Sequence, residues 1–535
     1  MGVQRFTGDD AGNVEPLGGD IDARCIVEFR PIGNDQNDRN NVWEGKYGFD
    51  WFRINDCEEL TKSGLSDDKI INQTKNGFSH YLDHDIIVGK YATNGDFVNS
   101  YNCADALANY LTYKKIPRLT RRRNYIIPWI SMGKPLTSIV KIKMIVKKDS
   151  TGIRNIRKIR VVSDEDYFVL YSDDSRASGK FVKKNGRVVF SCVDLFGPFN
   201  ENGQEIKLTI LYNENINKQI PANWAIKAYA FYNQDYTRNY NLDKEYHTLA
   251  GFLRIVNYSP LRVNILFVNF TVKAVVYNDQ NGNPDITTSQ LRTQRIGDSE
   301  IDKQKDCLER YLSQALVVPS IRTENLTMYV DERNLVRESS TLQFLNSDWG
   351  CSRNVAKTRD YGYVFMITGK NETRMKSGRK PVRLHEKLEE YVNSNDFHNG
   401  IYSGYYKIFF INGIGVSNYE GINKINTEGS LGGEAIDIDS KSAVVFSNPT
   451  DETVCHELLH CFGLYHSFSD KSHFTFKKCM TSNIMDYSFM VERGGNNGVV
   501  EKYNCLKLQS LGKWQWEMIR NKLNPDPQQR LAQLS

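Results

Sequence analysis

Three histidines near the C-terminal end of the chain have the spacing of ligands for a single metal ion. Residues 453–466 run Thr-Val-Cys-His-Glu-Leu-Leu-His-Cys-Phe-Gly-Leu-Tyr-His, which places the histidines at His456, His460 and His466. Residues four positions apart lie on one face of a helix, so the imidazoles of His456 and His460 can reach one ion. Gly463 can adopt the left-handed conformation that ends a helix. The chain can then turn sharply and return His466 as a third ligand.

The donor set indicates which metal to expect. Three neutral imidazoles with an open fourth position are typical of a catalytic zinc ion (Zn2+) rather than a structural one. Glu457 follows the first histidine, where its carboxylate can hold a water molecule beside the metal instead of binding the metal. A pair of ordinary histidines is the alternative for an isolated His-x-x-x-His. The chain has nine histidines, so chance is a poor explanation for three of them at these spacings.

The residues before the first histidine predict where the supporting helix begins. Asn448 is a good N-cap residue, and Pro449 is tolerated at the first helical position. The acidic Asp451 and Glu452 suit the positive end of a helix. We therefore expect a helix that begins at this point and carries the first two histidines on one face.

The full spacing His-Glu-x-x-His-x-x-Gly-x-x-His resembles the zinc-binding motif of the metzincin clan of zinc peptidases. The segment Thr-Ser-Asn-Ile-Met-Asp-Tyr at 481–487 resembles the Met-turn of that clan, and it is similar to the turn of pappalysin-like enzymes. Met485 matches the methionine beneath the histidines, and Tyr487 matches a tyrosine that approaches the zinc. The resemblance covers about residues 258–525. It implies a zinc endopeptidase that acts on a protein or peptide substrate.

The resemblance also implies roles for individual residues. Glu457 would be the general base, and Tyr487 would donate a hydrogen bond to the oxyanion. Residues 432–438 resemble the edge strand that holds substrate, and 442–446 resemble the last strand before the zinc helix. The alternative is a binding or carrier protein with a vestigial zinc-peptidase domain. The intact Glu457 argues against it, because a scaffold gains nothing from a general base there.

The expected fold class is multidomain, with mostly β modules in the N-terminal half and an α+β metzincin-like domain at 258–535. We predict a flexible lead-in at 1–20, an aromatic-rich module at 21–134 and a sandwich-like module with a linker at 135–257. Alternating segments separated by turn residues predict the antiparallel sandwich. Examples are Ile139–Val146, Tyr167–Tyr171, Lys180–Ser191, Ile206–Tyr212 and Ala225–Tyr232. In the last domain the pattern predicts strands at Arg262–Tyr277, Leu326–Val330 and Tyr406–Val416, and helices from Ser299 to Ala315 and at Leu384–Val392.

The aromatic string from Trp43 to Arg53 has two interpretations. Closely spaced aromatic residues and glycines can form a ligand platform, or they can pack a small core, which we favour because buried aromatic rings dominate core energetics. The string also resembles modules fused to bacterial contractile-injection effectors. That resemblance implies a secreted effector or toxin exported without a conventional signal peptide.

The basic residues are concentrated in one stretch. Between Lys114 and Arg160 there are fifteen lysines and arginines and one acid, Asp149. Such a stretch can dock on an anionic surface or partner, or it can be the solvated face of a strand. The alternation from Ile139 to Met144 favours the strand face. We do not expect a nucleic-acid partner.

Length and composition set the general class. A chain of 535 residues with 40% hydrophobic and 12% aromatic residues predicts several globular domains and excludes dominant disorder. No apolar run approaches the roughly 18 residues of a transmembrane segment, and the N-terminus lacks the apolar core of a signal peptide. We expect a soluble protein, exported by another route or otherwise cytoplasmic. One or two C-terminal disulfides are compatible with Cys455, Cys461, Cys479 and Cys505.

Overall fold

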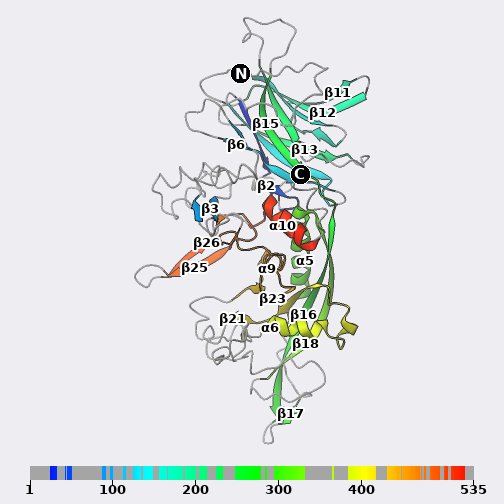
Figure 1. Cartoon of the computed structure of the whole chain (residues 1–535), viewed down its shortest axis with the longest axis vertical. Helices are drawn as coiled ribbons and strands as arrows, with labels where there is room; N and C mark the ends of the chain where they lie inside the picture. The colour runs from blue at the N-terminus through cyan, green and yellow to red at the C-terminus, as the bar shows by residue number, and fades with distance from the viewer. Residues whose placement is uncertain are drawn as a thin grey trace.

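The chain forms two β-rich assemblies that lie one after the other along the long axis of the molecule (Figure 1). The predicted β-rich, multidomain character is confirmed. The structure is a computed structural model. It describes residues 25–32, 43, 45–50, 87–91, 97–99, 113–115, 124–133, 136–148, 156–164, 167–184, 187–199, 204–213, 225–232, 247–278, 283–285, 295–331, 364–366, 384–416, 431–435, 437–447, 449–469, 471–472, 475–476, 482–493, 499–503 and 508–524. The predicted lead-in at 1–20 lies outside these residues.

The first assembly consists of two sheets packed face to face. The four-stranded sheet has the order β1 (Cys25–Pro31), β8 (Ile139–Lys148), β13 (Gln204–Tyr212), β10 (Phe168–Tyr171). The seven-stranded sheet has the order β11 (Ala177–Lys184), β12 (Arg187–Phe196), β9 (Ile156–Asp164), β14 (Ala225–Tyr232), β15 (His247–Val256), β7 (Trp129–Ser131), β2 (Phe49–Asp50). Alternation builds the core: in β8, Val140, Ile142 and Met144 point into it while Lys141 is exposed.

Strands from both predicted N-terminal modules share these sheets. Strand β1 pairs with β8, and β2 pairs with β7, which pairs with β15 in parallel. The boundary predicted between residues 134 and 135 therefore runs through one sandwich. The segment predicted as a single strand at Lys180–Ser191 is instead parts of the two antiparallel strands β11 and β12.

The aromatic residues described in the Trp43–Arg53 string belong to the sandwich core. Trp43, Tyr47 and Phe49 are buried in the cluster that the two sheets share. The Trp43 indole N–H donates to the Tyr47 carbonyl at 2.9 Å, and the Tyr47 hydroxyl donates to the Lys141 carbonyl at 2.6 Å. Their polar atoms are thus bonded inside the protein, which supports core packing rather than a ligand platform.

The second assembly is a mixed sheet. Its order is β18 (Val317–Asp331), β16 (Leu261–Asn278), β20 (Tyr406–Ile411), β23 (Ser442–Val445), β22 (Gly433–Ala435), and β17 (Asn283–Asp285) pairs with the end of β16. The first four strands are parallel, and β22 lies antiparallel at the edge. The strand predicted at Leu326–Val330 is only the last part of the long β18.

Helices cover both faces of this sheet. They are α5 (Asp298–Leu312), α6 (Leu384–Asn393), α9 (Thr453–Cys461) and α10 (Lys513–Leu523), with 3-10 turns η4 (Ser313–Ala315) and η6 (His398–Gly400). In β20, Ile408 and Phe410 pack on the side of α5, α9 and α10, while Phe409 and Ile411 pack on the side of α6. A strand covered on both faces has an uninterrupted apolar sequence, as Ile408–Ile411 has.

Four smaller groups of strands complete the described structure. They are β19 (Val364–Met366) with β21 (Ile414–Val416), β3 (Ile87–Tyr91) with β4 (Phe97–Asn99) and β24 (Thr475–Phe476), β5 (Tyr113–Lys115) with β6 (Asn124–Ile126), and β25 (Phe489–Arg493) with β26 (Val499–Tyr503). None of the helices among the described residues combines the length and apolar character needed to cross a bilayer.

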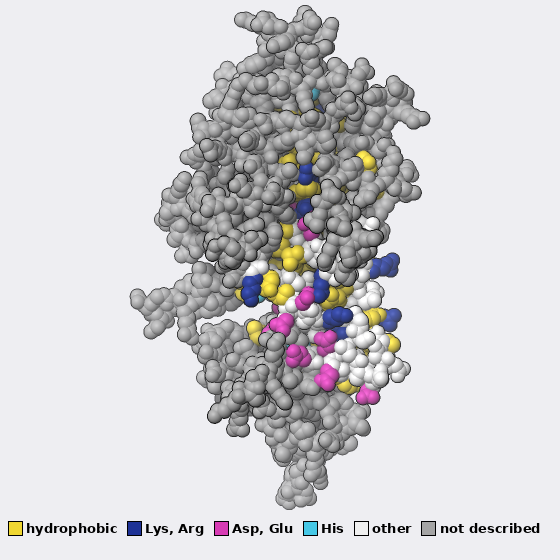
Figure 2. Space-filling view, viewed as in Figure 1, with side chains coloured by type: hydrophobic (Ala, Val, Ile, Leu, Met, Phe, Trp, Pro, Cys, Tyr) yellow, Lys and Arg dark blue, Asp and Glu magenta, His cyan; other side chains and the backbone are white. Residues whose placement is uncertain are grey.

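Part of the basic stretch is neutralised within the sandwich. Arg160 binds both carboxylate oxygens of the fully buried Asp194, at 2.5 and 2.7 Å, and Lys158 lies 3.6 Å from the same carboxylate. Lys143 pairs with Glu205 at 2.9 Å. On the face in Figure 2, most of the coloured basic and acidic side chains lie over the second assembly, not over the sandwich. Pairing within the sheet therefore accounts for several charges of this stretch.

The two assemblies share a hydrophobic core. Trp129 of β7 belongs to the same cluster as Trp514 and Trp516 of α10, which lies between the assemblies in Figure 1. Gly48 lies against Trp516, and the Ser313 hydroxyl donates to the Lys46 carbonyl at 2.8 Å. The segment before β2 is thus packed directly on the second assembly.

We predict that Gly48→Ala destabilises the protein. A Cβ at this position would lie 2.3 Å from Trp516 Cζ2 and 2.7 Å from the Gln314 carbonyl oxygen. Such overpacking lowers the free energy of unfolding by about 1–3 kcal/mol. Urea unfolding of the full chain measures the change. Gly179→Ala is the control, because nothing lies within 4 Å of its Cβ position; equal stability of the two variants would contradict the close packing of Gly48 on α10.

Candidate metal centre

The helix that carries the first two histidines is buried along most of its length. Val454, Leu458 and Leu459 of α9 are fully buried among the strands and helices of the second assembly. The helix begins at Thr453, later than the start predicted at Asn448, a residue outside the described part. The Thr450 N–H donates to Thr453 Oγ1 at 2.9 Å, and the Thr453 N–H donates to the Thr450 carbonyl. This local turn competes with a helical start at Pro449.

The helix ends as the sequence predicts. Gly463 has φ +95°, the left-handed region that a residue without Cβ adopts at low cost. Its N–H donates to the His460 carbonyl at 2.9 Å, and the Leu464 N–H donates to the Leu459 carbonyl at 3.0 Å. These two bonds form a Schellman motif, which reverses the chain direction. The reversal returns His466 toward the helix.

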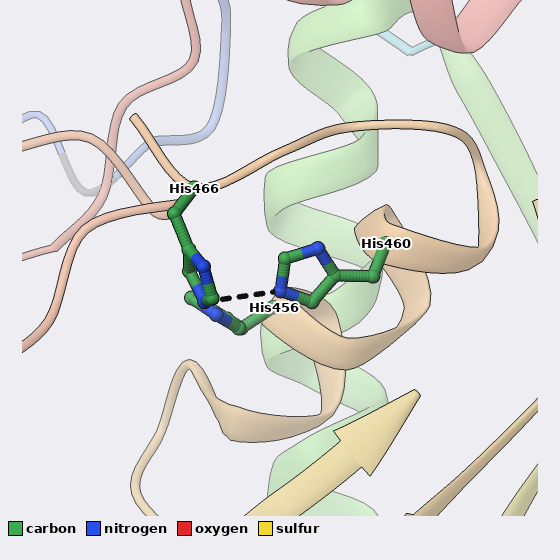
Figure 3. A group of neighbouring side chains, drawn as sticks. All are labelled: His456, His460 and His466. Carbon is green, nitrogen blue, oxygen red and sulfur yellow. Dashed lines mark hydrogen bonds between the residues drawn. The ribbon is translucent and has the colours of Figure 1, made fainter. Parts of the chain in front are cut away.

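The structure brings the three predicted ligands together. His456 and His460 project from α9, and His466 approaches them from the returning chain (Figure 3). One ligand atom from each residue lies within 4.8 Å of the others, and His460 Nε2 is 3.2 Å from His466 Nε2. Two imidazole nitrogens on one tetrahedral zinc stand about 3.3–3.4 Å apart, given bonds of about 2.0–2.1 Å. The group could therefore hold a metal ion.

Backbone carbonyls set the tautomers of two of these histidines. His456 Nδ1 lies 2.7 Å from the Ile484 carbonyl, and His460 Nδ1 lies 2.7 Å from the Leu464 carbonyl. A carbonyl can only accept, so each Nδ1 carries the proton and each Nε2 keeps a lone pair. This is the arrangement in which a histidine binds a metal while its other nitrogen is held by an outer partner.

Electrostatics keep these rings neutral. Burial, together with the charges of His460 and His466, holds the pKa of His456 well below its usual value. Burial likewise lowers the pKa of His460. A ligand must be deprotonated to bind a metal, so lowered pKa values favour binding near neutral pH.

Glu457 is buried beside the histidines and attached to the edge strand. Its Oε2 accepts from the Ala435 N–H at 2.8 Å, and a Cβ on Gly433 would lie 2.8 Å from Glu457 Cγ. Burial raises the pKa of Glu457 to about 8; the Ala435 hydrogen bond lowers it, and the charge of Glu434 raises it further. A cation at the histidines would favour the ionised carboxylate again.

The two other predicted site residues lie on the turn after the histidines. The Tyr487 ring is 4.9 Å from the His466 ring and 6.1 Å from the His456 ring, centroid to centroid. Met485 is fully buried, and its carbonyl accepts from the Ser467 N–H at 2.9 Å. The turn thus contacts His466 through the Tyr487 ring, and it contacts the neighbouring Ser467 through the Met485 carbonyl.

Two features of the site were not predicted from the sequence. Phe468 stacks on His466 with ring centroids 4.9 Å apart and planes 9° from parallel, and it also contacts Tyr487. An aromatic residue two positions after a ligand was the available signal. The carbonyls of Ile484 and Leu464 could not be identified from the sequence. Every residue has a backbone carbonyl, and only the fold decides where it points.

The C-terminal disulfides that the sequence allows receive no support from the cysteines that the structure describes. Cys455 and Cys461 are free and buried in α9. Residues six positions apart lie on different faces of a helix, so the thiols of Cys455 and Cys461 do not face each other. Both side chains are buried in the core. Cys479 and Cys505 lie outside the described residues.

Comparison with known proteins does not identify the chain. No family model matches it, and no curated protein matches it. Among solved structures, it is similar to the major pilin subunit BcpA of Bacillus cereus (10% identity) and to a variant of that subunit (11% identity). Each match has a TM-score of 0.15 and covers 31% of this chain and 49% of the pilin, about half its length. A similarity this low carries no inference about fold or function.

We predict that the protein binds one zinc ion through these histidines and that His460→Ala loses most of it. Two imidazoles leave the site underligated, which weakens binding strongly. Metal analysis after dialysis measures the content of each protein. His398→Asn is the control: His398 lies outside the group, and asparagine tolerates its positive φ of 46°. Full zinc occupancy in His460→Ala would contradict the assignment.

Proposed function

We propose that the protein is a zinc-dependent endopeptidase. The observation that carries this proposal is the combination of three convergent histidines, two of them fixed as Nε2 ligands, with a buried carboxylate next to them. A structural metal site has no use for an additional carboxylate that is not a ligand. A hydrolytic site requires one, because a general base must take the proton of the attacking water.

The chemistry divides between the metal and the side chains. A bound zinc ion would supply Lewis-acid polarisation of the scissile carbonyl and lower the pKa of a water molecule. Glu457 would accept the proton of that water and pass it to the leaving amine. Tyr487, whose ring lies against His466, would donate a hydrogen bond to the oxyanion.

Strand β22 is the proposed platform for substrate. It is the last strand of the mixed sheet in the described part of the chain, and it is joined to Glu457 by the Ala435 N–H. A peptide that pairs with the outer edge of β22 would extend the sheet by one strand. Its scissile bond would then lie close to the base, because base and edge strand are hydrogen-bonded to each other.

The sheet arrangement supports the resemblance to metzincins. Parallel strands end in an antiparallel edge strand beside the helix that bears the first two histidines. A left-handed Gly463 leads to the third histidine, and a buried methionine turn follows. We retain the pappalysin-like comparison for the turn, and we propose the N-terminal sandwich as a delivery or docking module of an exported, toxin-like effector.

A carrier protein with a vestigial site is the second candidate. It requires the buried Glu457 to be retained only for its hydrogen bond to the Ala435 N–H. Burial of a carboxylate costs free energy, as the raised pKa of about 8 for Glu457 indicates. A vestigial site would lose such a residue readily, so the active enzyme is the better supported proposal.

We predict that Glu457→Gln keeps zinc and loses hydrolysis. The amide has nearly the same shape but cannot take a proton, so cleavage of a denatured protein or peptide library should fall by at least about 10²-fold. Metal analysis and a cleavage assay, each with and without a chelator, separate the two effects. Glu452→Gln, the same change at the start of α9, is the matched control and should keep parental activity. Undiminished cleavage by Glu457→Gln would contradict the proposed mechanism.

A further inference from the structure

Helix α10 receives its N-terminal cap from the sandwich. The residue at its N-cap position is Gly512, which has no side chain to bond the first N–H groups. The Lys513 N–H instead donates to Asp50 Oδ2 at 2.5 Å, across 463 positions of sequence. Asp50 belongs to β2 and is 2% exposed. A carboxylate at a helix N-terminus is favourable both as a hydrogen-bond acceptor and toward the helix dipole.

The first turn of α10 is joined to the methionine turn by a pair of buried amides. The Asn483 side chain donates to Gln515 Oε1 at 2.7 Å, and Gln515 Nε2 donates back to Asn483 Oδ1 at 3.1 Å. Gln515 Oε1 also accepts from the Gly512 N–H at 2.7 Å. Asn483 is 1% exposed and Gln515 is not exposed. Buried amides with several partners have one well-defined orientation.

The same asparagine holds the backbone next to the ligand. Asn483 Oδ1 accepts from the Met485 N–H at 2.9 Å, and the Ile484 N–H donates to the Ser510 carbonyl at 2.9 Å. The Ile484 carbonyl between these bonds accepts from His456 Nδ1 at 2.7 Å. The carbonyl that fixes the His456 tautomer belongs to the peptide group between Ile484 and Met485. Hydrogen bonds of the Ile484 and Met485 N–H groups therefore hold its orientation.

We infer that Asp50, Gln515 and Asn483 are positioning residues through which the docked sandwich holds His456 in its metal-binding orientation. The path runs from β2 to the cap of α10, through the amide pair, to the Ile484 carbonyl. The first half of the chain is then a part of the metal site rather than only a delivery module. This inference rests on the metal centre of the proposed function, but it does not depend on peptidase activity.

The inference predicts an effect on metal binding that a purely structural role does not have. Outer partners of a histidine ligand typically change metal affinity by about 10–100-fold, so Gln515→Met should weaken zinc binding by about tenfold. Asn483→Asp, which removes the donor to Gln515, should weaken it similarly.

Asp50→Ala should weaken zinc binding by about fivefold, the fold-change that matches loss of a helix cap. Asp50→Asn keeps the accepting oxygen and should restore binding to within about twofold of the parent.

The test uses the whole 535-residue chain, with zinc affinity measured by competition against a chromophoric chelator. The visible spectrum of the cobalt-loaded protein reports the ligand geometry directly, and thermal unfolding of the metal-free forms reports stability. Asn269→Leu is the matched control, since Asn269 is a fully buried amide of β16 that donates to the Ile296 carbonyl at 2.9 Å. It should lower the unfolding midpoint and leave zinc affinity and cobalt spectrum unchanged.

Gln515→Met and Asn483→Asp change the amide pair from its two sides, so a folding defect in one variant does not remove the test. Asn483→Asp also keeps the oxygen that accepts from the Met485 N–H. Weakened zinc binding with an altered cobalt spectrum in Gln515→Met and Asp50→Ala, and its rescue in Asp50→Asn, supports the inference. Parental affinity and spectrum in those two variants, together with a lowered unfolding midpoint, overturns it while the metal centre stands. A parent protein that binds no zinc overturns the metal centre itself, and the inference with it.

Discussion

The candidate site depends on hydrogen bonds from two imidazole rings to backbone carbonyls. His456 donates to Ile484 and His460 donates to Leu464, each at 2.7 Å. With the protons held at Nδ1, both Nε2 lone pairs are directed to one place, where His466 joins them. The rest of the site follows from this constraint. The Schellman turn positions the Leu464 carbonyl, and the methionine turn positions the Ile484 carbonyl, so two irregular segments matter as much as the helix between them.

Burial then sets the electrostatic character of the site. It lowers the pKa values of His456 and His460 and raises that of Glu457 to about 8, so the metal-free site disfavours charge of either sign. Neutral imidazoles are ready to bind a cation. A divalent cation next to Glu457 reverses the penalty on the carboxylate, because an opposite charge nearby favours the ionised form. Metal binding and the ionisation of the base are coupled in this way.

Several elements could be predicted because their determinants are local. The alternation of β8, the long apolar β16 and the amphipathic α5 have the predicted type and nearly the predicted bounds. Strand β9 is not among the segments named from the sequence; its Lys158 and Arg160 are neutralised by Asp194 on the neighbouring strand β12. The hairpin of β11 and β12 had a local signal, the Asn-Gly pair at 185–186, which favours a two-residue turn.

The sequence by itself determined which side chains meet at the candidate metal centre. Helical periodicity brings His456 and His460 together, and a glycine that tolerates positive φ returns His466, so the whole set lies within eleven residues. Only the tertiary structure decided how the His456 ring is oriented and protonated and how α10 is capped. The carbonyl that holds His456 comes from 28 positions further along, and the carboxylate that caps α10 comes from 463 positions away. Such partners are chosen by packing between distant segments, and no local spacing encodes them.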